Sequence, residues 1–483
     1  TTPTTFTNLG AIDTSGINGK TQSFNVLKGT DGGAITINSN GGLTTGTLIS
    51  TGGEAINQAG LTAGDITLNA GNNLNVSGSI LAQGSAAEKS SSDGFKGGAG
   101  GSVSLSAGNI VNIASAIDVS GGRGDRYIDP ENGGNAGSIE IVGTSILLGT
   151  NLTANGGAPE GGLYGEGGSI TLTGPVTLYT HVELDTSGNI NGDITFNDEV
   201  IATDHRGENL TLTGKEITFV ENIAAAGVSL GDLDITASGN VNATNSHVFA
   251  KSLNIDSEMG VSVSSINTKG TEAGLIKITF SDDFQSGGVI SAKSTNAVAE
   301  DGDITIAGNE ENNTFTFGGD VLGKSVSILG DGGNDTFNLH GNVKGSESSS
   351  EMVSGGTGND TFNIHSNITA TIKGGSGTDT LIGSNQNNQW NISGNGAGVL
   401  FEENDAVDIL GPKIKFSTIE TLQGGNVNDT FMLFSNLASI ENIKGGVGAN
   451  SLQGADTVNT WNITGNDEGD VTGVDFFSGI QTL

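Results

Sequence analysis

The sequence of 483 residues contains no cysteine, only 5 prolines and few aromatic side chains (5%). Without cysteine the chain has neither disulfides nor thiolate metal sites, and a long chain of this kind suits export in an unfolded state. No apolar run approaches the roughly 18 residues of a membrane-spanning helix. The sequence does not begin with the charged region followed by an apolar region that is typical of a signal peptide, so we expect any secretion signal to lie outside this sequence.

Positive charge is also scarce. Lys and Arg together number 18 against 53 Asp and Glu, which gives a formal net charge of −35. Such a polyanion repels phosphate backbones and anionic lipid headgroups, so we expect no nucleic-acid partner and no insertion into or binding to a membrane. The same charge is compatible with divalent cations.

Glycine dominates what is present, with 81 residues, yet it follows no collagen-like triplet period. No segment of twelve or more residues has a clear helical apolar period. Short alternating runs such as ITLNA and SIEIV occur throughout instead, and this alternation is typical of strands. The composition therefore predicts an all-β protein.

Four stretches, at 64–84, 100–122, 136–157 and 167–188, align with one another, and each contains short strands with apolar residues two apart. Units of three such strands joined by Gly and Asn corners predict the coils of a three-sided β-solenoid, in which each coil needs its neighbours to bury its apolar side chains. The aligned pairs are Ile66/Leu68, Leu74/Val76 and Ile80/Ala82 in the first stretch, Val103/Leu105, Val111/Ile113 and Ile117/Val119 in the second, Ile139/Ile141 and Leu152/Ala154 in the third, and Ile170/Leu172 and Val182/Leu184 in the fourth.

Insertions recur at one place in this repeat, after the third strand, so we expect them to protrude from one corner of the solenoid as a stack of loops. They fall at 15–32, 52–63, 84–99, 121–135 and 156–166. The repeat style divides the chain into three parts: coils with long stacked loops (1–188), tighter coils (189–305), and coils with a distinct glycine-aspartate corner (306–483).

The corners of the third part follow the pattern G-G-x-G-x-D-x-U-x, where U is apolar. GGTGNDTFN at 355–363 and GGSGTDTLI at 374–382 match fully, whereas the copies at 330 and 424 each lack one glycine. Glycines allow left-handed backbone that can turn carbonyl groups toward a shared point, and the Asp adds charge. A purely structural interpretation stays open, because Gly-Asn-Asp sequences also form good turns.

These corners resemble the RTX (haemolysin-type) calcium-binding nonapeptide. The resemblance implies calcium as a ligand, with Asp335, Asp360, Asp379 and Asp429 as candidate ligands. RTX nonapeptides follow one another in tandem, whereas here the motif starts are 25 and 19 residues apart, so there is one motif per coil. The corner after that of Asp429 carries Asn450 in place of Asp.

The coils of 10–188 resemble large filamentous-haemagglutinin-like bacterial exoproteins. Two W-N-I-[ST]-G-N modules, at Trp390 and Trp461, resemble repeat tails of very large bacterial surface proteins. These resemblances imply a single elongated right-handed parallel β-helix that is secreted or located at the cell surface. The paired Trp residues suit either sugar stacking or, more simply, a wall residue repeated with its module.

The leading functional hypothesis is therefore a rigid adhesive segment that contacts glycan, host or matrix surfaces, or further copies and repeats of itself. The last residues, FSGIQTL at 477–483, repeat the start of two earlier sequence segments that continue into glycine corners. We therefore expect the given sequence to end within a repeat. The alternative is a glycan-binding or polysaccharide-acting (lyase- or epimerase-type) β-helix.

Few residues carry that alternative. The groups with mixed acid, base and aromatic character are 123–131 and 204–206, and His340 and His365 lie 25 residues apart. A solvated loop and an ordinary turn explain the first two equally well. Arg123-Gly124-Asp125 also spells an integrin-binding tripeptide on a predicted protruding loop. We expect no enzymatic activity from these residues.

Overall fold

The computed structural model is all-β: its described residues form strands, turns and loops, and no helix occurs among them. The chain divides into two compact units, Thr1–Lys251 and Ser252–Leu483. The structure describes all residues except 1–4, 9, 23–24, 88–94, 126–131, 160–161, 204–206, 225–228, 269–273, 295–299, 347–350, 403–413 and 438.

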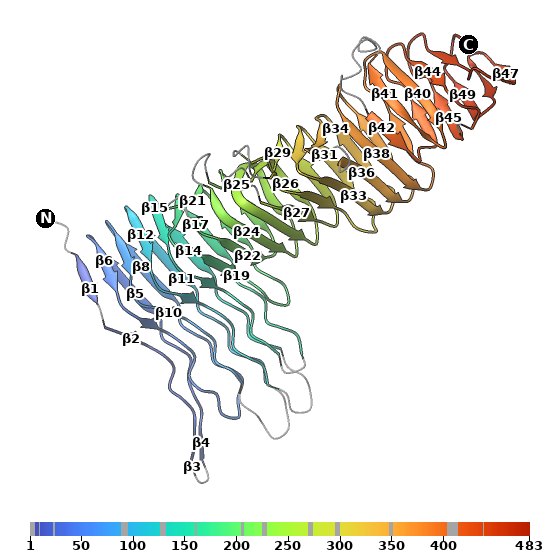
Figure 1. The fold of residues 1–483 in the computed structure, drawn as a ribbon. Coiled ribbons are helices and arrows are strands. Elements are labelled where there is room, and N and C mark those ends of the chain that lie inside the picture. Colours follow the sequence, from blue (N-terminus) through green and yellow to red (C-terminus); the bar gives the residue numbers. More distant parts are fainter. Residues whose placement is uncertain are drawn as a thin grey trace. The chain divides into compact units, whose positions relative to one another are not determined.

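Parallel ladders of short strands build the first unit, and Figure 1 shows successive strands stacked beside one another. The first ladder comprises β5 (Ile35–Ser39), β8 (Ile66–Ala70), β11 (Val103–Ala107), β14 (Ile139–Val142), β17 (Ile170–Thr173), β20 (Ile194–Phe196), β23 (Ile217–Phe219) and β25 (Val241–Ser257). The second comprises β1 (Phe6–Asn8), β6 (Leu43–Thr45), β9 (Leu74–Val76), β12 (Ile110–Ile113), β15 (Ser145–Leu148), β18 (Val176–Leu178) and β21 (Val200–Ala202). The third comprises β2 (Ile12–Asp13), β7 (Leu48–Ile49), β10 (Ile80–Leu81), β13 (Ile117–Asp118), β16 (Leu152–Thr153), β19 (Val182–Asp185), β22 (Leu210–Gly214) and β24 (Leu230–Ala237).

The register of these ladders follows the aliphatic repeat. Val103 pairs with Ile66 and Ile117 with Ile80, the displacement of 37 residues that the sequence predicts. Because side chains alternate along a strand, these residues point inward and are 0–1% exposed. One alignment was wrong: Leu152 pairs with Leu184, two residues beyond Val182, because β19 begins one pleat earlier than its neighbour β16.

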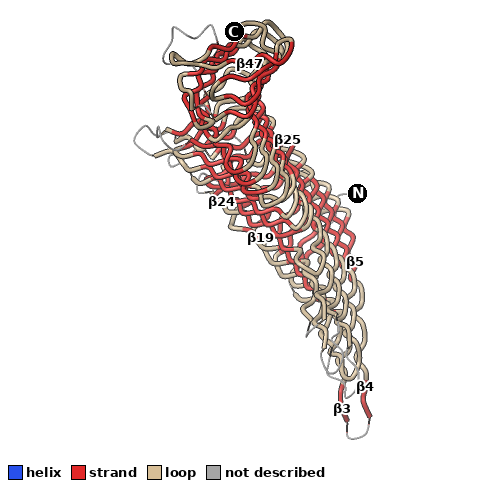
Figure 2. The backbone as a smooth tube through the Cα atoms, turned by 90° about the vertical axis from the view of Figure 1, so that its right-hand side faces the viewer, coloured by secondary structure: helices blue, strands red, loops and turns tan. Residues whose placement is uncertain are grey.

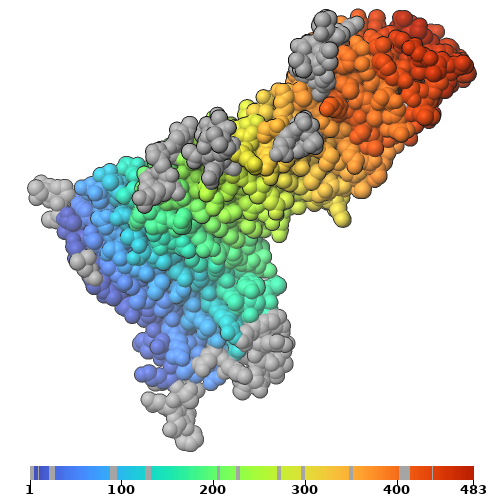
Figure 3. Space-filling view, in the orientation of Figure 1, coloured from blue at the N-terminus to red at the C-terminus, as the bar shows by residue number. Residues whose placement is uncertain are grey.

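The five insertions of the first unit form a projecting wing, which we define as the described residues of 15–32, 52–63, 84–99, 121–135 and 156–166. Figures 1 and 2 show these loops leaving the strands side by side, with the hairpin β3 (Lys20–Gln22) and β4 (Asn25–Leu27) at one edge. Figure 3 shows the described parts of the wing as a continuous surface.

Backbone hydrogen bonds join the outgoing and returning arms of the wing loops in a zigzag. They run from the N–H of Gly98 to the oxygen of Ser85, Gly122 to Gly98, Gly134 to Gly122, Gly157 to Gly134, and Gly165 to Gly157, at 2.7–3.0 Å. A Cβ at Gly122 would lie 1.8 Å from the Ser85 oxygen, and one at Gly134 would lie 1.9 Å from the Gly98 oxygen. The wing is thus glycine-rich because its arms pack backbone against backbone.

The second unit continues with parallel ladders. One comprises β27 (Ile276–Thr279), β30 (Ile304–Ala307), β33 (Val326–Gly332), β36 (Glu351–Thr357), β38 (Ala370–Ser376) and β42 (Ile414–Ser417). Another comprises β26 (Val261–Asn267), β28 (Asp283–Ser286), β31 (Thr314–Phe317), β34 (Thr336–Leu339), β37 (Thr361–Ile364), β39 (Thr380–Ile382), β43 (Thr421–Gln423), β45 (Ile440–Lys444) and β49 (Val474–Ser478). Shorter ones join β26 to β29 (Ile290–Ser291), β32 (Val321–Gly323) and β35 (Val343–Gly345), and β40 (Asn388–Gly394) to β44 (Thr430–Leu433) and β46 (Ser451–Gln453).

The two Trp modules interrupt the parallel pattern, which the sequence analysis did not predict. β40 pairs antiparallel with β41 (Ala397–Glu402), and β47 (Trp461–Gly465) pairs antiparallel with β48 (Glu468–Val471). Asn395 and Gly396 both have positive φ, 50° and 62°, between β40 and β41. An Asn-Gly turn of this kind matches the twist of a hairpin, so the signal was present in the sequence.

Candidate functional site

The four candidate aspartates lie inside the second unit at the start of strands. In Asp360-Thr361-Phe362 the strand period of two places Asp360 and Phe362 on the same inner side. Phe362 is fully buried, and it stacks on Phe337 of the neighbouring coil with ring centroids 4.8 Å apart. The buried apolar side chain that the motif predicts at position U therefore carries the aspartate inward with it. Asp335, Asp360, Asp379 and Asp429 are each at most 1% exposed.

Three of these side chains form one column, which we call the aspartate column: Asp335, Asp360 and Asp379. The backbone N–H of Asp335 donates to Oδ1 of Asp360 at 2.8 Å, and that of Asp360 donates to Oδ1 of Asp379 at 2.9 Å. Asn313 precedes the column and donates its N–H to Asp335 Oδ1, while Asp379 donates to the Glu420 carboxylate. Each coil is thereby tied to the next through a carboxylate oxygen.

A second row of side chains runs beside the column with the opposite direction of donation. The N–H of Asn334 donates to Oδ1 of Asn312, that of Asn359 to Asn334, and that of Thr378 to Asn359, at 2.6–2.8 Å. The column donates toward later coils, whereas this row donates toward earlier ones. The residue pair at each corner (Asn-Asp in the first two coils and Thr378-Asp379 in the third) therefore ties its coil to both neighbours, which supports the structural interpretation of these residues.

The second carboxylate oxygen of each aspartate in the column takes no part in these contacts between coils. Oδ2 of Asp335, Asp360 and Asp379 is buried and has no hydrogen-bond partner among the described residues. Burial raises the pKa of Asp335 to about 7, to which the charges of Asp360 and Asp331 add, while the N–H of Asn313 acts against the shift. Burial also raises the pKa of Asp379 to about 6, and it raises that of Asp360.

Asparagine copies of the same corner place a side-chain donor at this position. Nδ2 of Asn388 donates to the carbonyl oxygen of Ser384 at 2.8 Å, and Nδ2 of Asn450 donates to that of Gly446 at 3.5 Å, four residues earlier in both cases. Asn450 Nδ2 also donates to Gly479 O at 3.0 Å. In the aspartate column an oxygen takes the place of this nitrogen. This oxygen cannot donate as the amide nitrogen does, and a buried carboxylate oxygen without a donor is stabilised by a proton or by a cation.

Asp429 differs from the column. Its Oδ1 accepts from the N–H and side chain of Asn388, and its Oδ2 accepts from the N–H of Gly425 at 2.9 Å. Both carboxylate oxygens are therefore hydrogen-bonded, so Asp429 has no need of a cation. The sequence motif groups Asp429 with the other three aspartates, and the structure separates it from them.

The donor set at Asp335 suits a hard cation, because its buried Oδ2 lies near a backbone carbonyl oxygen. A Cβ at Gly330 would lie 2.1 Å from Asp335 Oδ2 and 2.3 Å from the Gly355 oxygen. Calcium takes six to eight oxygen ligands of these types. The described residues contain no convergent cluster of three or more His, Asp or Glu side chains, so backbone carbonyls would supply most of the ligands.

Other residues singled out by the sequence do not come together as a site. The rings of His340 and His365 stack with centroids 4.1 Å apart, without a metal-binding cluster around them in the described structure. Trp390 is fully buried and stacks on Phe431, so it is a wall residue and is inaccessible to sugars. Asp125 of the Arg-Gly-Asp tripeptide is only 6% exposed, which prevents it from reaching a receptor. The segments 126–131 and 204–206 lie outside the described residues.

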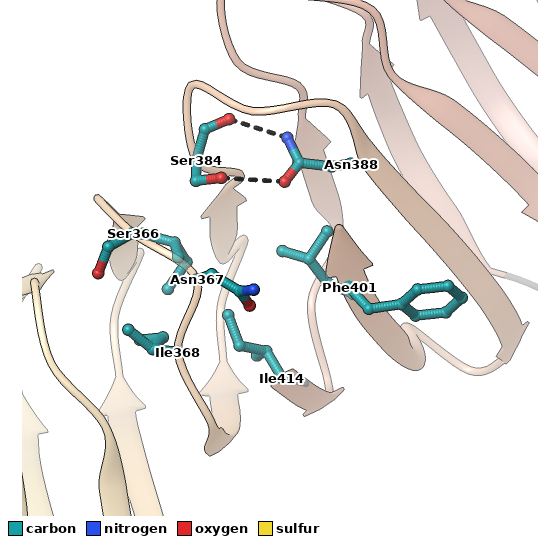
Figure 4. A pocket seen from close by; sticks show the side chains of 9 residues that line it. Ser366, Asn367, Ile368, Ser384, Asn388, Phe401 and Ile414 are labelled. Carbon is teal, nitrogen blue, oxygen red and sulfur yellow. Dashed lines mark hydrogen bonds between the residues drawn. The ribbon is translucent and has the colours of Figure 1, made fainter. Parts of the chain in front are cut away.

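A pocket of the second unit, shown in Figure 4, is too small for a sugar substrate. It lies beside Asn388, which hydrogen-bonds Ser384 through both side-chain ends. Its free volume of about 10 Å³ corresponds to roughly one water molecule. The pocket is lined by Ile364, Ser366, Asn367, Ile368, Ser384, Asn388, Leu400, Phe401 and Ile414.

Comparisons with family models, with curated proteins and with solved structures find no match to this chain. Among the described residues, no helix has the length and hydropathy needed to cross a membrane. The sequence signal for the aspartate column was the D-x-U spacing. The opposed asparagine row was missed, although Asn precedes Asp in three of the corner copies.

Proposed function

We propose that this chain is a non-enzymatic structural and adhesive segment of a large bacterial exoprotein of the filamentous-haemagglutinin-like type. It is secreted or held at the cell surface, and it winds as an elongated right-handed β-helix with three strands per coil. The wing presents backbone-packed loops for contact with glycan, matrix or cell surfaces, and further copies or repeats extend the rod.

One observation carries this proposal: parallel pairing passes from strand to strand over successive repeats in each unit, while the wing loops project from one side. Rods of this kind resist bending because every coil is hydrogen-bonded to two neighbours.

Adhesion is tested with microspheres that carry the chain and are washed over surfaces coated with acidic glycans, collagen or fibronectin. The matched variant has residues 157–165 replaced by a short Gly-Asn-Gly turn, because the next coil turns with only Gly188–Gly192. We expect retention above albumin-coated spheres on at least one surface, and weaker retention of the variant. Retention equal to albumin on every surface would reject the adhesive role.

We further propose that calcium stabilises the second unit through the aspartate column. Calcium would be held by Asp335, Asp360 and Asp379 with neighbouring backbone carbonyls, where it neutralises buried negative charge and joins adjacent coils. The spare Oδ2 atoms support this proposal, since the asparagine copies satisfy the same position with an N–H donor. Asp429 is left out because both of its oxygens are hydrogen-bonded.

A further inference from the structure

The loops of the wing are linked by two rows of backbone hydrogen bonds that advance from loop to loop. In the returning arms the N–H of Gly60 donates to Lys96 O, Gly97 to Asn132 O, and Gly133 to Leu163 O, at 2.8–3.1 Å. In this row, the residue that follows each acceptor is the donor of the next bond: Gly97 follows Lys96, and Gly133 follows Asn132. By this rule, the next donor in the row is the N–H of Tyr164.

The outgoing arms follow the same rule. The N–H of Ala87 donates to Arg123 O, and the next residue, Gly124, donates to Ala158 O at 3.0 Å. The next donor in this row would be residue 159, which is Pro159. Proline has no N–H, so the outgoing row ends at the one residue type that cannot continue it.

The wing ends at this loop although the strands continue. The following coil turns at Gly188–Gly192. It covers the base of the last wing loop, through Gly156 N–H to Ser187 O, Gly167 N–H to Ile190 O and Asn189 N–H to Gly165 O. Leu163, Tyr164 and Ile190 are 56%, 55% and 52% exposed there. No hydrogen bond of the Tyr164 N–H occurs within the described part of the chain.

We infer that Pro159 is a stop that keeps the wing from adding strands of another molecule. Each wing loop is a template for the next, because the backbone groups of one match those of its neighbour. A second copy of this chain carries the same loops and is therefore the molecule best suited to continue the stack. An open edge of this kind invites such pairing, and proline at an edge removes the donor that pairing requires.

This stop lies inside the chain, so it acts whatever precedes or follows the sequence. It also assigns the exposed Leu163, Tyr164 and Ile190 to side-chain contacts, since among the described residues of this edge the Tyr164 N–H is the one donor of the two rows left without an acceptor. The wing edge is thus open to side-chain recognition and closed to strand addition, independently of the ligand that the protein binds.

Restoring the missing donor tests this inference. Pro159→Ala and Pro159→Gly both supply an N–H at the edge, and Ala158→Gly serves as the control because it loosens the same loop without adding a donor. Sedimentation velocity of the full chain over a concentration series compares all three with the wild type, after circular dichroism has verified folding. Residue 159 is at the loop surface, so its replacement should leave the fold intact. Two different replacements are compared in case one of them fails to fold.

We expect Pro159→Ala and Pro159→Gly to self-associate at concentrations where the wild type and Ala158→Gly do not, with about a twofold or larger rise in weight-average mass. Adding Tyr164→Pro to either variant removes the second donor and should reverse much of that association. If Pro159→Ala and Pro159→Gly are folded and sediment as the wild type does across the series, Pro159 is not what limits the wing and the inference is overturned.

Discussion

The amide of Asp335 donates a 2.8 Å hydrogen bond to Oδ1 of Asp360, one coil further along the chain. This bond uses one carboxylate oxygen to hold two coils together and leaves the other oxygen buried without a partner. The corner is therefore both a structural clamp and a site of uncompensated charge. These two roles can be separated by experiment, because a side chain can keep the clamp while losing the charge.

The stability of the second unit without divalent cations should fall as the pH rises from 5 to 8. The folded-state pKa values of Asp335 and Asp379, about 7 and about 6, lie above the ordinary value of an aspartate. A raised folded-state pKa stabilises the fold fully below the unfolded-state value, near pH 4, and this contribution is lost as the pH rises through 6 to 7. Urea unfolding in EDTA should reveal a loss on the order of 3 kcal/mol across this range.

The double variant Asp335→Asn/Asp379→Asn provides the comparison for that titration. Its unfolding free energy should change much less between pH 5 and pH 8, because its column titrates at Asp360 alone. General repulsion among the chain's many carboxylates acts on both proteins equally. An identical pH profile in the wild type and the double variant would assign the effect to the surface instead.

Replacing Asp335 by Asn should stabilise the protein at pH 8 in EDTA. Asn keeps Oδ1 for the N–H of Asn313 and places an amide donor where Asn388 and Asn450 donate to backbone carbonyls. We expect a gain of about 1–3 kcal/mol from removal of the unpaired buried oxygen. Asp429→Asn is the matched control and should lose about 1 kcal/mol, since its Oδ2 already accepts from Gly425. A gain of the same size in both variants would contradict the account.

Asp331→Gly should also stabilise the corner, by about 0.5–1 kcal/mol. Asp331 has φ 72°, whereas the equivalent residues of the next two coils, Gly356 and Gly375, are glycines at φ 114° and 132°. The substitution also removes a negative charge that raises the pKa of Asp335, so that pKa should fall. Urea unfolding and an NMR titration of Asp335 measure the two effects separately. A loss of stability would show that the Asp331 side chain makes a contribution larger than its backbone strain.

Gly122→Ala should destabilise the wing by about 1–3 kcal/mol, because the new methyl group meets the Ser85 carbonyl. Gly33→Ala is the control, since the nearest atom to its new Cβ lies 3.5 Å away. We expect the control to stay within about 0.5 kcal/mol of the wild type. Hydrogen exchange of the wing amides, Gly98 and Gly134 included, locates the change. Equal protection in the two variants would mean that the arms are not packed as tightly as the zigzag implies.

The repeats made much of the fold predictable from sequence. The displacement of Val103 from Ile66 set the strand register, and the D-x-U spacing put Asp360 and Phe362 on one inner face. The hairpin at Asn395-Gly396 was not predicted, because the coil repeat on either side of it favours parallel pairing. Whether the Oδ2 atom of each aspartate has a hydrogen-bond partner was not predictable from sequence, because it depends on whether an N–H such as that of Gly425 turns toward the carboxylate.

Calorimetry at pH 8 with calcium and with EDTA tests the aspartate column most directly, using the wild type and the triple variant Asp335→Asn/Asp360→Asn/Asp379→Asn. Binding to the folded state alone raises the melting temperature as the cation concentration increases. We predict that calcium raises the melting temperature of the wild type and leaves that of the triple variant unchanged, and that the triple variant melts above the wild type in EDTA. A wild-type melting temperature that is the same in calcium and in EDTA would contradict a cation site in the column.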